Sequence, residues 1–232
     1  FIARLGSKRL EKKHLYNVNG KTLIEWLILR FLHEFNNEIS RDKIKLFITT
    51  TESPENKIFQ KIFKEKKVDI YFGDNFNIPK RLLGCANKHK ISKIIAIDGD
   101  DILCSTSSAR KVFMALDNYN YVKTKGLPLG MNITGFTKEF LSKTKVCNFK
   151  TLETGWTKIF NDKNIYLINQ TFSSREKKIR MTLDYIEDFK FFQAVFLFLG
   201  SRVVSISDNE LIEVIEKESF SDINSFLSEL YW

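Results

Sequence analysis

The amino-acid sequence predicts an α/β domain in which helices flank a mostly parallel mixed sheet. The chain has 232 residues, of which 43% are hydrophobic and three are prolines, so it can bury a sizeable core within one domain. Short apolar runs alternate with helical patterns through residue 115, which is typical of a doubly wound domain. In such sheets ligands bind beyond the carboxyl ends of the strands.

The first half of the chain supplies the clearest elements. Apolar residues recur at helical spacing over residues 22–35, where Thr22 is a candidate N-cap. Pro54 marks another helix start. The remaining predictions are strands at 45–49, 69–72 and 94–97 and a helix at 77–88. The loops after Ala3, after Ile48 and after Ile97 should therefore meet in one cleft.

The second half is less regular, above all between residues 116 and 179. There we expect strands at 119–124, 131–134 and 165–169 and a short helix at 138–143. Beyond it we expect a strand at 180–183, an apolar helix at 186–199 stopped by Gly200, and helices beginning at Ser207 and spanning 221–230. No repeat or linker divides residues 1–232, which we interpret as one domain. The first strand is short at Phe1, so we expect a few upstream residues and a longer polypeptide.

The net charge of +9 is compatible with nucleic acid, an anionic membrane or acidic small molecules. The lysines are dispersed and form no nucleic-acid module, and no apolar run approaches the roughly 20 residues of a membrane span. We therefore expect acidic small-molecule partners. The cysteines Cys85, Cys104 and Cys147 are far apart, which indicates a reducing cytoplasm. We expect His14 to lie at the surface, in the basic loop described next.

A basic loop follows the first apolar residues. Ala3 and Gly6 let a ligand approach the backbone closely, and N–H groups of such a turn, which includes Ser7, can form an anion-binding concavity. Five cationic side chains surround it: Arg4, Lys8, Arg9, Lys12 and Lys13. A triphosphate needs both directional donors and cations. The loop is a candidate triphosphate site, and a solvated basic loop is the alternative.

Two acidic segments follow predicted strands. Asp98, Gly99, Asp100 and Asp101 follow the strand at 94–97, and Asp184 follows the strand at 180–183. Clustered carboxylates repel one another unless a cation joins them, and Mg²⁺ typically takes one or two carboxylates together with phosphate oxygens and water. The alternative is that both segments are ordinary strand-end turns, where Asp is common. In either case we expect surface positions.

The pattern A-R-x-G-S-x-R-L-x-x-K-x-L over residues 3–15 resembles the opening signature of the sugar-activating cytidylyltransferases. These include CMP-Kdo and CMP-N-acylneuraminate synthetases and the spore-coat polysaccharide type, which this chain resembles most. The resemblance implies a Rossmann-like nucleotidyltransferase fold, with the triphosphate on residues 4–9 and on Lys13. Glu11 stands where the family usually has proline.

Four further elements occur in the family's order, so the resemblance extends to about residue 199. Asp98-Gly99-Asp100 resembles the element whose last Asp binds Mg²⁺, and the segment beginning at Arg180 resembles the element that supplies the second ligand, here Asp184. Residues 46–51 with Pro54 and Glu55 resemble an element beside the nucleotide. Arg81 matches an arginine that reaches it. The nucleotide contacts so implied also include Thr49, Thr50, Asp98 and Gly99.

The resemblance implies transfer of CMP from CTP to an acidic, sugar-type acceptor, with Mg²⁺ as cofactor and pyrophosphate as leaving group. The expected catalytic residues are Arg9, Lys13 and Asp100, and the protein is expected to be a homodimer. Acceptor contacts are expected from Lys123, Lys125, Glu153 and Trp156. The alternatives are transfer to a sugar phosphate, an alcohol phosphate or a phosphonate, a nucleotide-sugar glycosyltransferase, and a nucleotide-binding module of similar topology.

Overall fold

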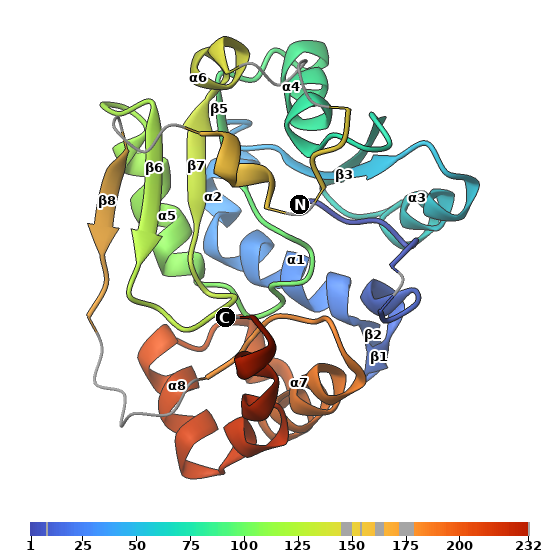
Figure 1. The fold of residues 1–232 in the computed structure, drawn as a ribbon, viewed down its shortest axis with the longest axis vertical. Coiled ribbons are helices and arrows are strands. Elements are labelled where there is room, and N and C mark those ends of the chain that lie inside the picture. The colour runs from blue at the N-terminus through green and yellow to red at the C-terminus, as the bar shows by residue number, and fades with distance from the viewer. Residues whose placement is uncertain (8, 145–149, 154, 161–164, 172–178, 232) are drawn as a thin grey trace.

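The computed structural model describes residues 1–7, 9–144, 150–153, 155–160, 165–171 and 179–231 and has a mixed α/β architecture (Figure 1). The strands are β1 Asn17–Val18, β2 Lys21–Thr22, β3 Leu46–Thr51, β4 Val68–Gly73, β5 Lys93–Ala96, β6 Tyr121–Lys125, β7 Thr134–Thr137 and β8 Tyr166–Asn169. The α-helices are α1 Leu23–Glu34, α2 Asn36–Ser40, α3 Ile58–Ile62, α4 Ile78–Lys88, α5 Thr106–Ala115, α6 Lys138–Lys143, α7 Ile186–Leu199 and α8 Asp208–Lys217.

The amino-terminal segment joins two parts of the main sheet. β3 pairs with β4 in parallel, and a second part has the order β5-β7-β6-β8. Ile2 forms parallel bridges to Thr49 on one side and to Asp98 on the other. The Ile2 N–H donates to the Ile97 carbonyl at 2.8 Å, and the Thr49 N–H donates to the Phe1 carbonyl at 2.8 Å. Figure 1 shows the N-terminus between β3 and the other strands.

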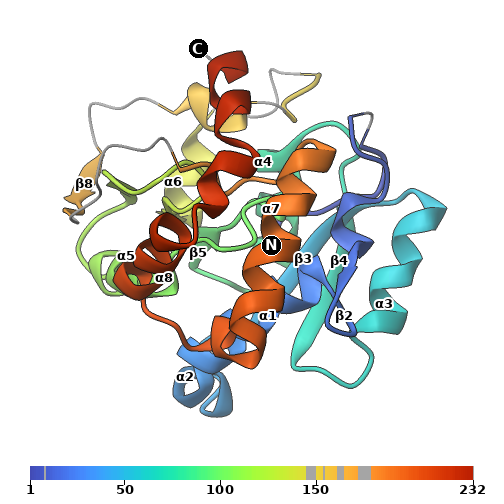
Figure 2. The same cartoon turned by 90° about the horizontal axis from the view of Figure 1, so that it is seen from below.

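Each face of the sheet carries its own apolar core. Phe1, Ala3 and Ile97 pack in the larger core, which includes residues of α1, α5, α7 and α8. Ile2 and Ala96 point the other way, into a smaller core with residues of α4 and α6. Figure 2 shows α5 and α8 on one side of α7 and α3 on the other, and all four helices contribute residues to the larger core. The doubly wound prediction is therefore confirmed, because helices cover both faces.

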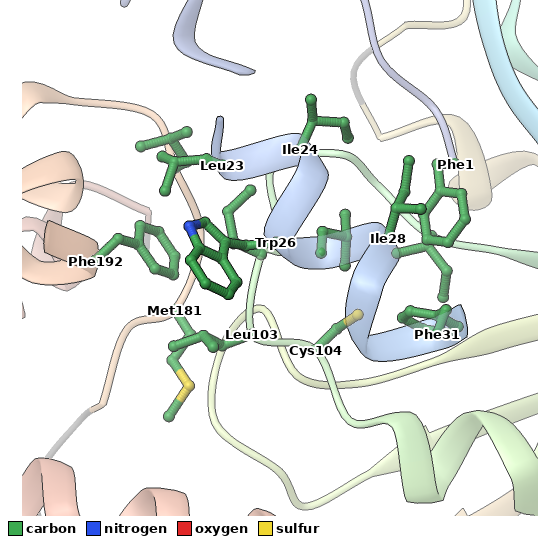
Figure 3. Close-up of a cluster of buried hydrophobic side chains, with 14 of the residues drawn as sticks. Phe1, Leu23, Ile24, Trp26, Ile28, Phe31, Leu103, Cys104, Met181 and Phe192 are labelled. Atoms are coloured by element: carbon green, nitrogen blue, oxygen red, sulfur yellow. The ribbon is translucent and has the colours of Figure 1, made fainter. Parts of the chain in front are cut away.

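Helix α1 lies at the centre of the larger core (Figure 3). Its residues Leu23 and Trp26 lie near Phe192 of α7, and Phe31 makes an edge-to-face contact with Phe1, with 5.1 Å between the ring centroids. The helix begins with a complete capping box, in which the Thr22 hydroxyl accepts from the Glu25 N–H. The predicted helix start at Thr22 is confirmed.

The structure agrees with most predicted elements and corrects three. The strand expected at 131–134 is β7, Thr134–Thr137, three residues later. Residues 180–183 form no strand: Met181 bonds to the Leu129 carbonyl and Leu183 to the Asp100 carbonyl, so this segment bridges two loops and forms no ladder. The last helix is two 3₁₀ helices, Phe220–Ile223 and Ser225–Tyr231, since Asn224 breaks it to bond inward to Arg180 and Asp188.

None of the helices in the described part of the chain has both the length and the apolar character needed to cross a membrane.

Candidate active site

Lys13 lies at the centre of the candidate site, where it joins two loops that are distant in the sequence. Its Nζ atom donates to Asp100 Oδ2 at 2.6 Å, to the Leu183 carbonyl at 2.8 Å and to Asp184 Oδ1 at 3.1 Å. The Lys13 side chain is only 7% exposed. A short 3₁₀ helix, Lys13–Leu15, begins here after Lys12, whose positive φ turns the basic loop inward.

Arg9 approaches the same carboxylate from the solvent side. Its Nη2 atom donates to Asp184 Oδ1 at 2.8 Å, while half of its side chain remains exposed. The guanidinium lies over the ring of Tyr185, with 5.6 Å between its Cζ atom and the ring centroid. Arg9 and Lys13 therefore place two cations on one carboxylate, and Arg9 remains accessible to an anionic ligand.

The position of Asp100 depends on the close approach of Gly99 to the amino-terminal segment, residues 1–3. The Gly99 N–H donates to the Ile2 carbonyl at 2.8 Å, and a Cβ atom at Gly99 would lie 2.8 Å from that oxygen. A side chain would also approach Ala3 and the His14 ring. The missing side chain therefore lets the acidic loop pack directly against residues 1–3.

The partial burial of the acidic cluster explains why it needs a cation. Burial raises the pKa of Asp100 to about 6, although the neighbouring Lys13 ammonium acts to lower it. Burial also raises the pKa of Asp98, and that of Asp101 well above its usual range. These carboxylates repel one another and Asp184. Positive charge at the position of Lys13 therefore favours their ionised forms.

A buried ion pair between Arg180 and Asp188, which the sequence analysis did not predict, fixes the position of Asp184. Asp188 accepts from Arg180 Nε at 2.8 Å and from Arg180 Nη2 at 3.0 Å, and both side chains are fully buried. Its Oδ2 atom also accepts from the backbone N–H groups of Asp184 and Tyr185 at 2.9 and 3.0 Å. The position of Asp188 in the first turn of α7 was the available signal.

Two surface expectations are wrong. Asp184 is 4% exposed because Lys13, Arg9 and Arg180 surround it. His14 is 2% exposed, and its Nε2 atom lies 3.5 Å from Asp100 Oδ1. Neither ring nitrogen has a hydrogen-bond partner in the described structure. Burial and the nearby Lys13 charge lower the pKa of His14 to about 3, so the imidazole is neutral.

Glu153, expected among the acceptor contacts, lies between Arg4 and Arg81. Arg4 Nη2 is 2.6 Å from Glu153 Oε2, and Arg81 Nη2 is 3.8 Å from Glu153 Oε1. The backbone fixes this arrangement, since Leu152 bonds to Phe76 and Ile78 at the start of α4. Burial lowers the pKa of Arg81 to about 10, whereas Glu153 acts to raise it. The structure thus brings Glu153 to two residues expected to contact the nucleotide.

The other predicted acceptor contacts lie in different parts of the fold. Trp156 is buried, donates to Asp98 Oδ1 at 3.3 Å and packs against Phe136 and Phe160. Lys123 and Lys125 lie on β6, which β7 separates from β5.

The remaining predicted residues lie in the basic loop itself or at the end of β3. The Ser7 hydroxyl accepts from the Leu10 N–H at 3.5 Å, and Gly6 lies beside the Arg4 guanidinium. Thr49 and Thr50 are buried near the end of β3, with Thr49 bonded to the Phe1 carbonyl. Lys8 lies outside the described residues.

Within the described ranges, no three His, Cys, Asp or Glu side chains converge as a metal site. A cavity of about 550 Å³ is lined by Leu46 and Lys93, at the starts of β3 and β5. It opens at the opposite end of these strands from Lys13, so it is not part of the candidate site.

Comparison with known proteins agrees with this fold. A family model described as cytidylyltransferase matches residues 2–197. The chain is 26% identical over 234 residues to an uncharacterized protein of Methanocaldococcus jannaschii, with 96% of this chain and 92% of that protein covered.

Two solved structures share the fold. One is a cytidylyltransferase from Leptospira borgpetersenii, with a TM-score of 0.79, 22% identity and coverage of 95% of this chain and 93% of that chain. The other is CMP:2-keto-3-deoxy-manno-octonic acid synthetase complexed with CTP, with a TM-score of 0.58, 12% identity and coverage of 85% and 96%. The fold is that of the Rossmann-like nucleotidyltransferases. The match over residues 2–197 shows that the chain belongs to the cytidylyltransferase family.

Proposed function

We propose that this protein transfers CMP from CTP to an acidic, sugar-type acceptor and releases pyrophosphate. The observation that carries the proposal is the Lys13 ammonium, held between Asp100 and Asp184 at the carboxyl end of the sheet. Arg9 adds a second, half-exposed cation at Asp184. This combination of fixed cations and carboxylates is suited to a polyphosphate substrate.

In the proposed reaction an acceptor hydroxyl attacks the α-phosphorus of CTP. A bond forms between the hydroxyl oxygen and that phosphorus, and the bond to the β-phosphate oxygen breaks. The hydroxyl proton passes to solvent or to a nearby carboxylate, and pyrophosphate leaves. Arg9 and Lys13 neutralise the charge of the leaving group, while Arg4 and the backbone of Gly6 and Ser7 hold the phosphates in line.

We further propose that Mg²⁺ binds to Asp100 and Asp184. The donor set fits, because oxygens of both carboxylates lie within 3.1 Å of a single nitrogen, so one cation can contact both. Two carboxylates suit an ion that takes its remaining ligands from phosphates and water. When bound, Mg²⁺ would polarise the α-phosphate and lower the pKa of the acceptor hydroxyl. Lys13 could then turn toward the phosphates.

The acceptor class and the assembly are also proposals. Lys123 and Lys125 on β6 are candidate partners for an acid group, and the net charge of +9 favours anionic substrates in general. A homodimer is supported by Tyr166 and Leu167, which are exposed on β8 at the end of the sheet order. A cytoplasmic setting is supported by the buried free thiols of Cys85 and Cys104.

The test measures pyrophosphate release with CTP, Mg²⁺ and a panel of acceptors. The panel contains 2-keto-3-deoxy sugar acids, sugar phosphates, alcohol phosphates and phosphonates, and product analysis identifies the acceptor used. Release with a sugar acid supports the full proposal. Release only with a phosphate or phosphonate acceptor would show that the acceptor belongs to that class and is not a sugar acid. The absence of release with every acceptor would contradict the proposed activity.

A further inference from the structure

We propose that Arg81 and Glu153 together recognise the cytosine base and distinguish it from uracil. This inference rests on the proposed function, because it assigns the base specificity of that same site. It concerns two atoms that face each other without bonding: Arg81 Nη2 and Glu153 Oε1, which are 3.8 Å apart.

Both atoms are buried polar groups with no hydrogen-bond partner in the described part of the chain. A second polar atom of each side chain is engaged: Arg81 Nε donates to the Asp74 carbonyl at 2.9 Å, and Glu153 Oε2 contacts Arg4 at 2.6 Å. Arg81 is only 1% exposed. An unsatisfied buried donor beside an unsatisfied buried acceptor is unfavourable, unless a ligand supplies both partners.

The surrounding backbone restricts the spacing between the Arg81 and Glu153 side chains. Arg81 lies in the first turns of α4, where Gly73 packs so closely that a Cβ atom there would lie 3.0 Å from Arg81 Cγ. Glu153 follows Leu152, whose backbone bonds to Phe76 at 2.7 Å and to Ile78 at 3.0 Å. The backbone therefore presets the spacing of the donor and the acceptor before any ligand binds.

The ligand that fits this pair presents a donor next to an acceptor. The cytosine edge does so, since its N4 amine donates and its adjacent N3 atom accepts. N4 would donate to Glu153 and N3 would accept from Arg81. Uracil has the reverse pattern, with O4 as an acceptor and N3–H as a donor, so its O4 would face a carboxylate. Adenine shares the cytosine pattern and must be excluded by its size.

Arg4 gives the base access to this pair. Its side chain is 43% exposed and reaches Glu153 from the phosphate loop. In the proposed complex Arg4 turns to the phosphates. Glu153 Oε2 then loses its contact with Arg4, and Glu153 Oε1, beside Arg81, receives the N4 amine. Binding of the triphosphate and recognition of the base are thereby linked through one flexible side chain.

The test measures nucleotide binding by calorimetry with Mg²⁺ and without acceptor, so that no turnover occurs. The ligands are CTP, UTP and the triphosphate of pyrimidin-2-one riboside, which lacks the N4 amine but adds no bulk. The wild type should bind CTP about 10- to 100-fold more tightly than either analogue, as for one hydrogen bond to a charged group. In Glu153→Gln this preference should fall to about threefold or less. Glu139→Gln is the matched control, because Glu139 pairs with exposed Lys143 on α6.

The outcomes separate this inference from the proposed function. If Glu153→Gln keeps the wild-type preference for CTP over both analogues, the base is read elsewhere, although the activity stands. Equal wild-type affinity for CTP and the pyrimidin-2-one triphosphate also overturns the inference, and this comparison does not depend on the folding of any variant. If the wild type binds no nucleotide at all, the proposed function itself fails.

Discussion

Asp188 fixes the backbone of Asp184, because its Oδ2 atom accepts a hydrogen bond from the Asp184 N–H at 2.9 Å. The same carboxylate neutralises the fully buried Arg180. One residue thus compensates a buried charge and orients a carboxylate that contacts Lys13 and Arg9. This relationship ties the stability of the fold to the geometry of the site.

Asp188→Asn should therefore destabilise the protein and impair its activity together. The substitution leaves the buried Arg180 charge with only the more distant Asp184 carboxylate, at 3.5 Å, and breaking a buried ion pair typically costs about 3 kcal/mol or more. Chemical denaturation measures the loss, and pyrophosphate release is assayed below the transition. Glu187→Gln, one residue earlier and only partly buried, should change the free energy of unfolding little. Equal stabilities of the two variants would contradict the role of Asp188.

Asp100→Asn and Asp184→Asn should each reduce turnover by several orders of magnitude. Each removes one of the two carboxylates that contact Lys13 and that we propose bind Mg²⁺. The losses should be non-additive in the double variant, since either single change already disrupts the site. Turnover is followed by pyrophosphate release. Asp184→Asn at near wild-type turnover would exclude the two-carboxylate site.

The same two variants should differ in thermal stability. Asp184 is buried among three cations, whereas the Asp100 side chain is 31% exposed. Asp184→Asn should therefore lower the melting temperature more than Asp100→Asn does. These melts also serve as the folding control for the turnover measurements.

Lys13→Ala and Arg9→Ala should weaken the binding of CTP more than that of CMP. Each removes a charge-assisted contact that we propose is made to the β- and γ-phosphates, worth about 1.5–3 kcal/mol. Calorimetry with both nucleotides measures the difference. Lys21→Ala offers a control, because Lys21 lies on β2 over the Trp26 ring. If CTP and CMP lose affinity equally, Arg9 and Lys13 do not hold the terminal phosphates.

His14→Leu should make the protein less sensitive to acid. The pKa of His14 is about 3 in the folded protein and near 6.5 in the unfolded chain. Between these pH values the unfolded state binds more protons, so the free energy of unfolding falls as the pH falls, by up to about 1.4 kcal/mol per pH unit. The variant lacks this decline.

The measurement compares urea unfolding of wild type and His14→Leu from pH 7 to pH 4. The difference between the two should grow in favour of the variant as the pH decreases. His33→Leu, at an exposed position of α1, should follow the wild type throughout. A constant difference between wild type and His14→Leu would show that His14 is not held neutral.

Sequence patterns correctly predicted the helices whose formation depends on interactions between neighbouring residues. The periodicity of residues 22–35 with Thr22 as cap predicts α1, and the apolar run ended by Gly200 predicts α7, Ile186–Leu199. These signals need only a few neighbouring residues, because caps and amphipathic spacing act within one or two turns. The family and the nucleotidyltransferase fold also followed from short motifs.

Tertiary contacts determined what the sequence did not predict. His14 resembles a surface residue of a basic loop, but Gly99 and Asp100 enclose it from a segment more than eighty positions away. Residues 180–183 have strand-forming character, yet their partners are single carbonyls of two loops. Glu153 has no local signal for its place beside Arg4 and Arg81. Such contacts depend on which distant segments the fold brings together.

The placement of residues 1–3 between β3 and Asp98 has a consequence for the order in which the protein assembles during synthesis. This segment is translated before either of its neighbours, and its second side bonds to the carbonyl of Ile97 and the N–H of Gly99. The side that faces β3 can pair earlier, but the second side stays unpaired until nearly a hundred further residues have been synthesised. Pairing over such sequence distances is slow, so the basic loop that follows Ala3 acquires its shape late, and nascent chains would be poor ligand binders until then.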